Sequence, residues 1–496
     1  MNDSEELPVA ATSSVWRYAH ATRARLVIDA ADYFELAREA MAGARRSIFL
    51  IGWDFDTRIR LAGGRRWWNI PGRERYPARL GAFVVWLVRR QRHLKVQVLI
   101  WNFGALKFLA RGSMIGDLLR WRAHPAIAAR LDGAHPVGCS HHQKILTIDD
   151  RVAACGGIDM TGARWDTPEH LDDDPRRQRP GGQGYGPWHD VTMLMEGEVA
   201  LALGDLGRER WKIACGEILP AGKPDGPSPW PERLEAEFEN VEFGIARTRA
   251  GWRSAPEIRE IENLFIEQIG RAKRFVYAET QYFASRRIAE AIARRLTEAD
   301  PPEFFIVNSL SAHGWLEQTA MDAARVRLIH AVLEHDHARR FHVFVPYTAG
   351  GTPIYVHAKL MIVDDEILRV GSANMNNRSM GLDSECDVFL DTARPANANI
   401  GPRISELRLR LLAEHCGVAP EAVVGAIEDH GSMAAAVDAL ARSGKYLERF
   451  ALLPLGDTEK ALADSGLLDP ERPKETFEPM AKRGLFRRGG ILRRPD

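Results

Sequence analysis

The stretch His142-Gln143-Lys144-Ile145-Leu146-Thr147-Ile148-Asp149 has a second copy later in the chain, His357-Ala358-Lys359-Leu360-Met361-Ile362-Val363-Asp364. In both copies one residue separates His from Lys, and the Asp follows the Lys after four further residues. The two copies also agree downstream, where Gly156 matches Gly371 and Asp159 matches Asn374 in register. A long repeat that carries the same reactive residue types predicts two similar half-domains that share one active site.

Each copy opens an apolar run, which predicts a buried strand. In an extended strand, residues two apart share one face, so His and Lys of each copy should lie on one wall of a cleft. Strand-like runs alternate with helix-like periodicity along the chain, which predicts an α/β protein with two sheet-and-helix domains around one shared active site. We expect helices over residues 32–46 and 256–272, and strands over 47–53, 96–101, 275–278, 304–308 and 341–345.

These residue types suit reactions at phosphorus. A neutral imidazole is a competent nucleophile, and a second imidazole can protonate the leaving oxygen. Lysine and amide side chains beside them would stabilise the charge on the phosphoryl oxygens. A single His-x-Lys would more often be structural, but a pair in matching contexts favours a catalytic interpretation.

Bulk properties restrict the class of partner. The chain has 496 residues, with 67 basic and 67 acidic side chains, and this balance argues against a nucleic acid held by long-range charge. The five cysteines show no metal-ligand spacing and should be reduced thiols. The acidic N-terminus does not resemble a signal peptide, and no apolar run has transmembrane length. We therefore expect a soluble protein that is cytoplasmic or peripherally bound to a membrane.

Composition suggests the domain boundaries. The Pro- and Gly-rich residues 220–235 predict a linker between a first domain at 25–219 and a second domain at 236–454. Residues 1–24 should be an N-terminal extension. Residues 455–496 should be a tail with a basic end, either a solvated segment or a tether for anionic lipid.

Longer motifs surround the two copies. In the first half they include Gly156-Gly157-Ile158-Asp159, the run from Arg164 to His170, and Pro187-Trp188-His189-Asp190. In the second half they include the run from Glu279 to Phe283, Gly371-Ser372-Ala373-Asn374 and Arg378-Ser379-Met380. With these motifs the chain resembles the phospholipase D superfamily over about residues 25–418, and it is most similar to the plant and animal catalytic core.

The resemblance implies metal-independent cleavage of a phosphodiester through a phosphohistidine, without a cofactor. It implies that His142 is the nucleophile and His357 the general acid. Asp190 and Glu385 would orient the imidazoles, because a nucleophilic imidazole needs a partner on its other nitrogen. Lys144, Lys359 and Asn374 would hold the phosphoryl oxygens. Four further residues would have supporting roles. Asp149 and Asp364 would brace the strand ends, and the other two are Asp159 and Ser372.

The remaining features have two interpretations each. The insertion around Asp172-Asp173-Asp174 could bind calcium, but its spacing favours a solvated loop, and its glycines from Gly181 to Gly186 suggest a mobile lid. Trp53, Trp101 and Trp211 lie in apolar stretches and should be core residues. Trp188 and Tyr282 could line a headgroup pocket. Arg66-Trp67-Trp68 could insert at an interface or cap a helix.

We therefore expect a phospholipase D that hydrolyses glycerophospholipids such as phosphatidylcholine and transfers the phosphatidyl group to alcohols. Its partners would be a phospholipid membrane surface, with water or an alcohol as acceptor, and a monomer suffices because one chain holds both motifs. The alternatives are a cardiolipin or phosphatidylserine synthase, a nuclease with the same paired motifs, and an inactive lipid-binding scaffold. Two intact imidazoles argue against the scaffold.

Overall fold

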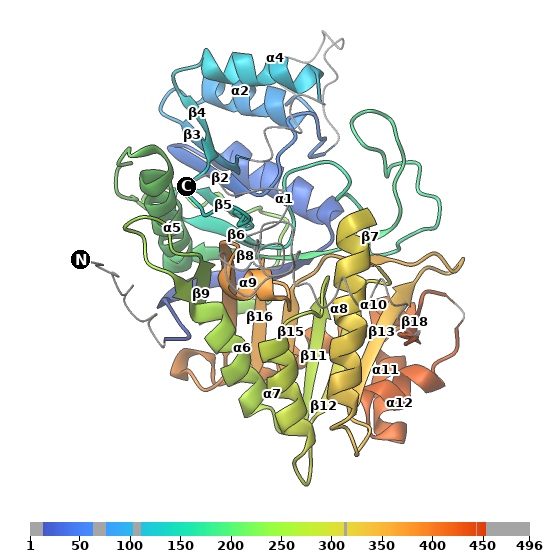
Figure 1. The fold of residues 1–496 in the computed structure, drawn as a ribbon. Helices are drawn as coiled ribbons and strands as arrows, with labels where there is room; N and C mark the ends of the chain where they lie inside the picture. The colour runs from blue at the N-terminus through green and yellow to red at the C-terminus, as the bar shows by residue number, and fades with distance from the viewer. Residues whose placement is uncertain (1–12, 63–75, 103–110, 312–314, 443, 453–496) are drawn as a thin grey trace, which may run out of the picture.

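A computed structural model of the chain describes residues 13–62, 76–102, 111–311, 315–442 and 444–452 (Figure 1). The expected basic tail at 455–496 and the Arg66-Trp67-Trp68 segment lie outside these residues.

The first half of the chain builds one sheet-and-helix unit. Its strands are β1 (Arg17–Ile28), β2 (Ser47–Gly52), β3 (Lys95–Trp101), β4 (Ile127–Asp132), β5 (Ile145–Ile148), β6 (Val152–Gly156), β7 (Trp188–His189) and β8 (Val191–Gly197). Its helices are α1 (Ala30–Gly43), α2 (Leu80–Arg90), α4 (Ser113–Arg122) and α5 (Glu198–Cys215).

The second half builds a similar unit. Its strands are β9 (Phe238–Arg249), β10 (Ile258–Arg259), β11 (Phe275–Thr280), β12 (Glu303–Asn308), β13 (Phe341–Tyr347), β14 (Tyr355–Val356), β15 (Leu360–Val363), β16 (Ile367–Gly371), β17 (Glu385–Asp391) and β18 (Tyr446–Arg449). Its helices are α6 (Glu260–Arg271), α7 (Arg286–Leu296), α8 (Trp315–Leu333), α9 (Asn377–Gly381), α10 (Gly401–Cys416), α11 (Pro420–His430) and α12 (Met433–Ala439), with a 3-10 turn at Pro395–Asn397.

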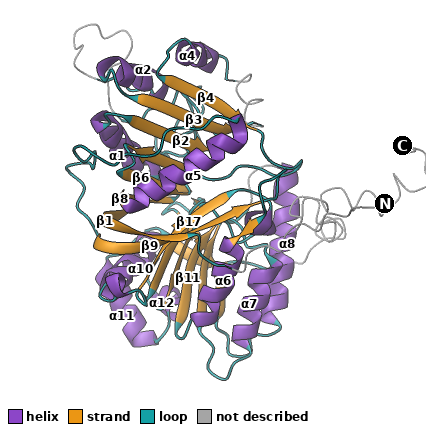
Figure 2. Ribbon diagram, turned by 90° about the vertical axis from the view of Figure 1, so that its left-hand side faces the viewer, coloured by secondary structure: helices purple, strands orange, loops and turns teal. Residues whose placement is uncertain are grey.

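The strand order shows the internal repeat. From the centre outward, the first half runs β1-β8-β6-β5-β2-β3-β4, and the second runs β9-β17-β16-β15-β11-β12-β13 with β18 at its edge. Matching strands therefore hold matching places, and β5 and β15 carry the two motifs. The antiparallel pair β1–β9 joins the two halves into one continuous sheet, which Figure 2 shows between two sets of helices. The α/β repeat architecture predicted from the sequence is confirmed.

Local sequence explains the elements. In α6 the buried residues Ile261, Leu264, Phe265 and Ile269 recur at helical spacing, so one face packs on the sheet. In β5 and β15 every residue is buried, as expected for central strands covered on both faces. The strands and helices predicted from periodicity are present, with ends that differ by a few residues.

The structure adds detail to the expected boundaries. β1 begins at Arg17, so the last residues of the expected N-terminal extension belong to the central sheet. Part of the linker is packed, since Trp230 is buried and its indole Nε1 donates to the Leu234 carbonyl at 2.9 Å. All five cysteines are free thiols. Within the part of the chain that the structure describes, no helix has the length and apolarity needed to cross a bilayer.

Candidate active site

Hydrogen bonds between the two halves position both motif histidines. The His142 backbone N–H donates to the Ser384 carbonyl at 2.9 Å, and the His357 N–H donates to the His189 carbonyl at 2.7 Å. Each histidine lies just before its strand, so its side chain stands at a strand end, where the halves meet. The start of each motif is therefore fixed by the opposite half of the molecule.

The motif aspartates Asp149 and Asp364 are structural. The Asp149 carboxylate accepts backbone N–H groups of Arg45, Arg46 and Ser47, each at 2.8 Å. Asp364 does the same for Lys273, Arg274 and Phe275 at 2.6–2.8 Å. Both aspartates have positive φ in the turn that follows their strand, a conformation that Asp tolerates well. They tie the strand that carries each histidine to its neighbouring strand.

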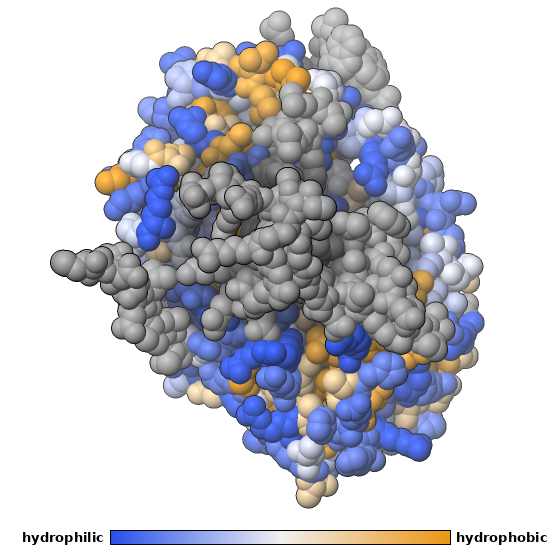
Figure 3. Space-filling model, viewed as in Figure 1, coloured by the Kyte–Doolittle hydropathy of each residue, from blue (hydrophilic) through white to orange (hydrophobic). Residues whose placement is uncertain are grey.

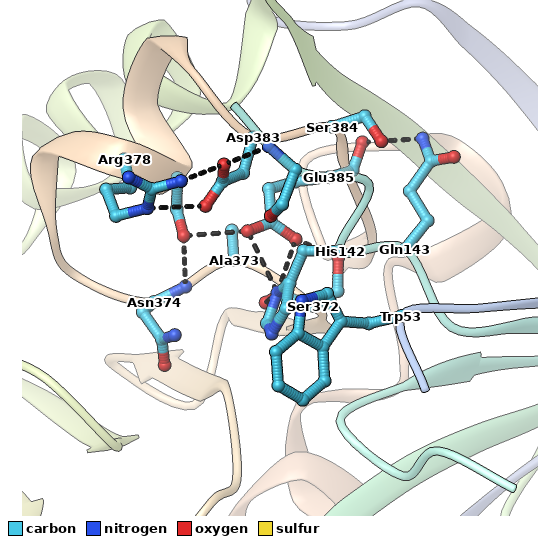
Figure 4. A network of polar contacts seen from close by, with 12 residues as sticks. Trp53, His142, Gln143, Ser372, Ala373, Asn374, Arg378, Asp383, Ser384 and Glu385 are labelled. Atoms are coloured by element: carbon cyan, nitrogen blue, oxygen red, sulfur yellow. Dashed lines mark hydrogen bonds and ion pairs between the residues drawn. The ribbon is translucent and has the colours of Figure 1, made fainter. Parts of the chain in front are cut away.

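Each histidine is oriented by a carboxylate from the other half. His142 Nδ1 lies 3.1 Å from both carboxylate oxygens of Glu385, as Figure 4 shows, and His357 Nδ1 lies 2.7 Å from Asp190 Oδ2. The Ser372 and Ser379 hydroxyls donate to Glu385, the latter at 2.8 Å. Because the carboxylates contact Nδ1, the Nε2 of each imidazole can face the substrate. The structure thus brings together the imidazoles and carboxylates predicted from the sequence.

Burial controls the protonation of these pairs. Burial, with the charges of Lys144 and Lys359, lowers the pKa of His142 well below its ordinary value. Burial also lowers the pKa of His357, and it raises the pKa of Asp190 to about 7 and that of Glu385 to about 8. Each His–carboxylate pair can therefore still hold a proton near neutral pH. The His142 pair must lose this proton for His142 to act as a nucleophile, whereas the His357 pair must keep it for His357 to act as an acid.

The two lysines have different surroundings. Lys144 Nζ lies 3.3 Å from Asp159 Oδ2, so a carboxylate neutralises its charge. Lys359 Nζ instead donates to the Gln281 side-chain oxygen at 3.2 Å, and the Asn374 amide lies 3.5 Å from the same oxygen. Burial and the charge of Lys144 lower the pKa of Lys359 to about 7. The change from Asn374 to Asp159 at matching positions therefore makes the cleft electrically asymmetric.

A cleft of about 1190 Å³ lies between the halves and is lined by His142, His357, Asn374 and Glu385. Trp188 and Tyr282 line it, as predicted. The prediction that Trp53 and Trp101 are core residues is wrong, because both line the cleft and stack on each other at 5.9 Å between ring centroids. They follow buried strands at the strand ends that face the cleft. Trp211 is fully buried, as predicted.

Comparison with known proteins agrees with this geometry. The family profile described as "Phospholipase D" matches residues 284–463. Phospholipase D A of Dictyostelium discoideum is 24% identical over 477 residues, and the match covers 80% of this chain and 36% of that protein. Phospholipase D alpha 1 of Carica papaya is 24% identical, with 56% of this chain and 49% of that protein covered. The chain belongs to the phospholipase D superfamily.

A solved structure shares the fold. The phosphatidylserine synthase of Haemophilus influenzae Rd KW20 superposes with a TM-score of 0.55 at 12% identity, covering 88% of this chain and 98% of that one. The chain spans about half or less of the length of the curated superfamily members it matches.

The insertion of this superfamily member is fastened at one end. Asp172 accepts the Thr348 hydroxyl, the Thr352 hydroxyl at 2.8 Å and the Gly350 N–H at 2.9 Å. The expected solvated loop is thus held to the second half at Asp172. The following segment, with Gly184 and Tyr185, lines the cleft, and whether it moves as a lid stays a prediction.

Sequence reasoning missed a supporting network behind the first motif. His141 Nε2 lies 3.0 Å from Asp132, and its Nδ1 lies 2.8 Å from the Ser384 hydroxyl. Arg210 bonds both Asp132 and the Gln143 side chain, at 2.7 and 2.9 Å. His141 adjoins the first motif and Gln143 belongs to it, but Asp132, Arg210 and Ser384 lie far from it in the chain, so no local sequence signal connects them to the motif.

A second buried cluster could hold a divalent cation. His170 Nε2 lies 3.4 Å from Asp29 Oδ2 and 3.5 Å from Glu414 Oε1, and His189 Nδ1 lies 3.4 Å from the same two side chains. Among the described residues, no hydrogen-bond partner is found for four of these atoms, Asp29 Oδ2, His170 Nε2, His189 Nδ1 and Glu414 Oε1. Four N/O ligands around a tetrahedral cation stand about 3.4 Å apart. The other imidazole nitrogens contact carboxylates, Asp166 at 3.0 Å and Glu279 at 2.9 Å, as metal-bound histidines do.

Proposed function

We propose that the chain is a phospholipase D that cleaves glycerophospholipids such as phosphatidylcholine and transfers the phosphatidyl group to water or an alcohol. The crossed His–carboxylate pairs support this proposal most strongly. They hold each imidazole by Nδ1 and leave its Nε2 without a carboxylate partner among the described residues, and the charges of Lys144 and Lys359 act on both imidazoles. These groups suit a double displacement at phosphorus, in which one imidazole attacks and the other transfers protons.

The proposed reaction has two balanced steps. In the first, His142 Nε2 attacks phosphorus and the bond to the headgroup oxygen breaks, while His357 gives its Nε2 proton to that oxygen. In the second, water or an alcohol attacks phosphorus, its proton goes to His357, and the bond between phosphorus and His142 breaks. Lys144, Lys359 and Asn374 stabilise the charge on the non-bridging oxygens.

Phosphatidylcholine vesicles with dilute ethanol would test the proposal, with and without a chelator. We expect phosphatidylethanol and free choline from the wild-type chain, and neither product from His142→Ala or His357→Ala. Loss of either imidazole should reduce turnover by at least about 10³-fold. Folded wild-type protein that made no product from lipids with several different headgroups would exclude this function.

The membrane partner is also a proposal. Ile115 and Leu119 on α4 are 42% and 62% exposed, and Arg120 and Arg122 lie on the same helix. Figure 3 shows apolar residues at the surface in its upper part, over α2 and α4. Because Arg111, which lines the cleft, lies just before α4, this helix begins beside the cleft. An exposed apolar and basic helix suits peripheral contact with anionic lipid.

A flotation assay with anionic vesicles checks this contact. Replacing both Ile115 and Leu119 by Glu should reduce bound protein severalfold, whereas Glu at Ile218, an exposed apolar residue just after α5, should not. Equal binding of all three proteins would assign the membrane contact to another surface.

A further inference from the structure

On the His142 side of the cleft, every cationic side chain that we describe has a carboxylate partner. Lys144 pairs with Asp159 at 3.3 Å. Arg111 pairs with Asp54 at 2.7 Å. Arg378 pairs with Asp383 at 2.7 Å, as Figure 4 shows. This side therefore has little uncompensated positive charge.

The His357 side is different. Arg164 and Arg179 line the cleft, and Lys359 lies close to His357. No carboxylate of the described residues lies within ion-pair distance of any of the three. Within the described parts of the chain, Arg164 donates only to the Ala163 carbonyl, at 3.1 Å, and its buried Nε has no hydrogen-bond partner. The Arg164 charge also acts on the catalytic groups, because it helps to lower the pKa of His357 and of Lys359. Among the described residues, Arg164 and Arg179 are thus the cleft-lining cations that have no carboxylate partner.

Aromatic residues hold Arg164 in place. Its guanidinium lies 4.3 Å from the centre of the Trp188 ring, and Trp188 also stacks on Tyr355 at 4.6 Å between centroids. The Trp188 ring is therefore already in contact with a cation and another ring. A quaternary ammonium group, which binds to open aromatic faces, would meet an arginine here.

This inference rests on the proposed function, in which His142 attacks and His357 protonates the leaving oxygen. In-line displacement puts the leaving headgroup, and later the acceptor alcohol, opposite His142 and therefore beside His357. We propose that this subsite favours headgroups and acceptor alcohols that carry an anionic group, a phosphate or a carboxylate, over others of similar size, and that Arg164 and Arg179 bind that group; phosphatidylcholine is accepted without this contact. Arginine suits either anion, because its planar fork of donors matches their paired oxygens.

A competition between two acceptors of similar size tests the proposal. The chain would act on phosphatidylcholine vesicles, whose net charge is zero, with equimolar glycerol and glycerol 3-phosphate. The measured quantity is the ratio of the two phosphatidyl products. We expect the wild-type chain to favour glycerol 3-phosphate, and Arg164→Gln or Arg179→Gln to reduce the ratio about tenfold each, as for loss of a charged hydrogen bond. Arg176→Gln is the control, since Arg176 lies nearby on the same insertion, pairs with Asp174 and does not line the cleft.

The outcomes separate the two proposals. A wild-type chain that makes phosphatidylethanol but uses glycerol as readily as glycerol 3-phosphate would overturn the inference and leave the proposed function standing. Equal slowing with both acceptors in Arg164→Gln, at an unchanged ratio, would also overturn it, because Arg164 would then hold the transferred phosphoryl group. No transfer to any acceptor, ethanol included, would refute the proposed function itself. Melting temperatures near the wild-type value establish that the variants are folded.

Discussion

At the scale of single residues, the His142–Glu385 pair makes the reaction sensitive to pH. His142 attacks only when its Nε2 carries no proton, so the pair must lose one proton before reaction. Burial raises the pKa of Glu385 to about 8. The pair therefore loses this proton at a higher pH than an ordinary histidine would. The His357–Asp190 pair must keep its proton, and burial raises the pKa of Asp190 to about 7, so we expect kcat/KM to pass through a maximum between about pH 7 and 8.

Glu385→Gln should change this profile in a defined direction. The amide oxygen still accepts the Nδ1–H of His142, but it cannot ionise. His142 is then the group of this pair that titrates. Burial and the charges of the two lysines lower its pKa, so the acid limb should move to lower pH. The maximal rate should fall by about 10²–10⁴-fold, as when a catalytic imidazole loses its carboxylate. An acid limb that stays in place would assign the titration to another group.

The sequence singled out the two imidazoles and two carboxylates that the structure brings together, but it did not show how they pair. Asp190 follows the first motif and Glu385 the second, yet each carboxylate contacts the histidine of the other half. Chain order carries no signal for this crossing, because it depends on how the halves dock. Gln281 was also missed as the bridge between Lys359 and Asn374, because chain order does not show that β11, β15 and β16 are neighbouring strands.

At the scale of elements, Asp149 and Asp364 hold adjacent strands together. Asp149→Ala would leave three backbone N–H groups without an acceptor, at a cost of about 2–4 kcal/mol in the free energy of unfolding. Denaturant or thermal unfolding would measure this loss, and Asp364→Ala should behave alike. Asp173→Ala, at an exposed acidic residue, is the control and should be neutral. Full stability in Asp149→Ala would contradict the bracing role.

Elements with clear periodicity were predicted correctly, and residues at their ends were not. Trp53 and Trp101 follow apolar strands, so pattern alone assigned them to the core. A strand end can face either the core or a cleft, and the choice depends on the opposite half. The same limit hid the buried cluster of Asp29, His170, His189 and Glu414, whose members come from β7, α10 and two loops.

That cluster should bind about one divalent cation per chain, because it gathers four N and O ligand atoms within 4.8 Å of one another, with His-to-carboxylate distances of 3.4–3.5 Å. Metal analysis of the purified protein would measure this, and a strong chelator should lower the melting temperature. His170→Ala should lose both the metal and the response to chelator. If the purified chain contains no metal and its stability responds to pH but not to chelator, the cluster is stabilised by protonated histidines paired with carboxylates and not by a metal ion.

At the scale of the whole molecule, the continuous sheet makes the two halves interdependent. β1 and β9 pair directly across the middle, and the carboxylates of each half orient the imidazole of the other. Neither half can form a complete His–carboxylate pair alone. The repeat therefore gives one active site made from both halves.

This arrangement predicts that a monomer is active and that inactive variants cannot rescue one another. His142→Ala and His357→Ala chains, unfolded together and refolded, should show no activity, because each chain completes its own defective cleft. Light scattering on the wild-type chain should give the mass of one chain. If chains instead exchanged halves across the β1–β9 seam, a mixed pair would unite an intact His142 with an intact His357, restoring about one site in four. Activity near that fraction would place the working cleft between two chains, and its absence would place it within one.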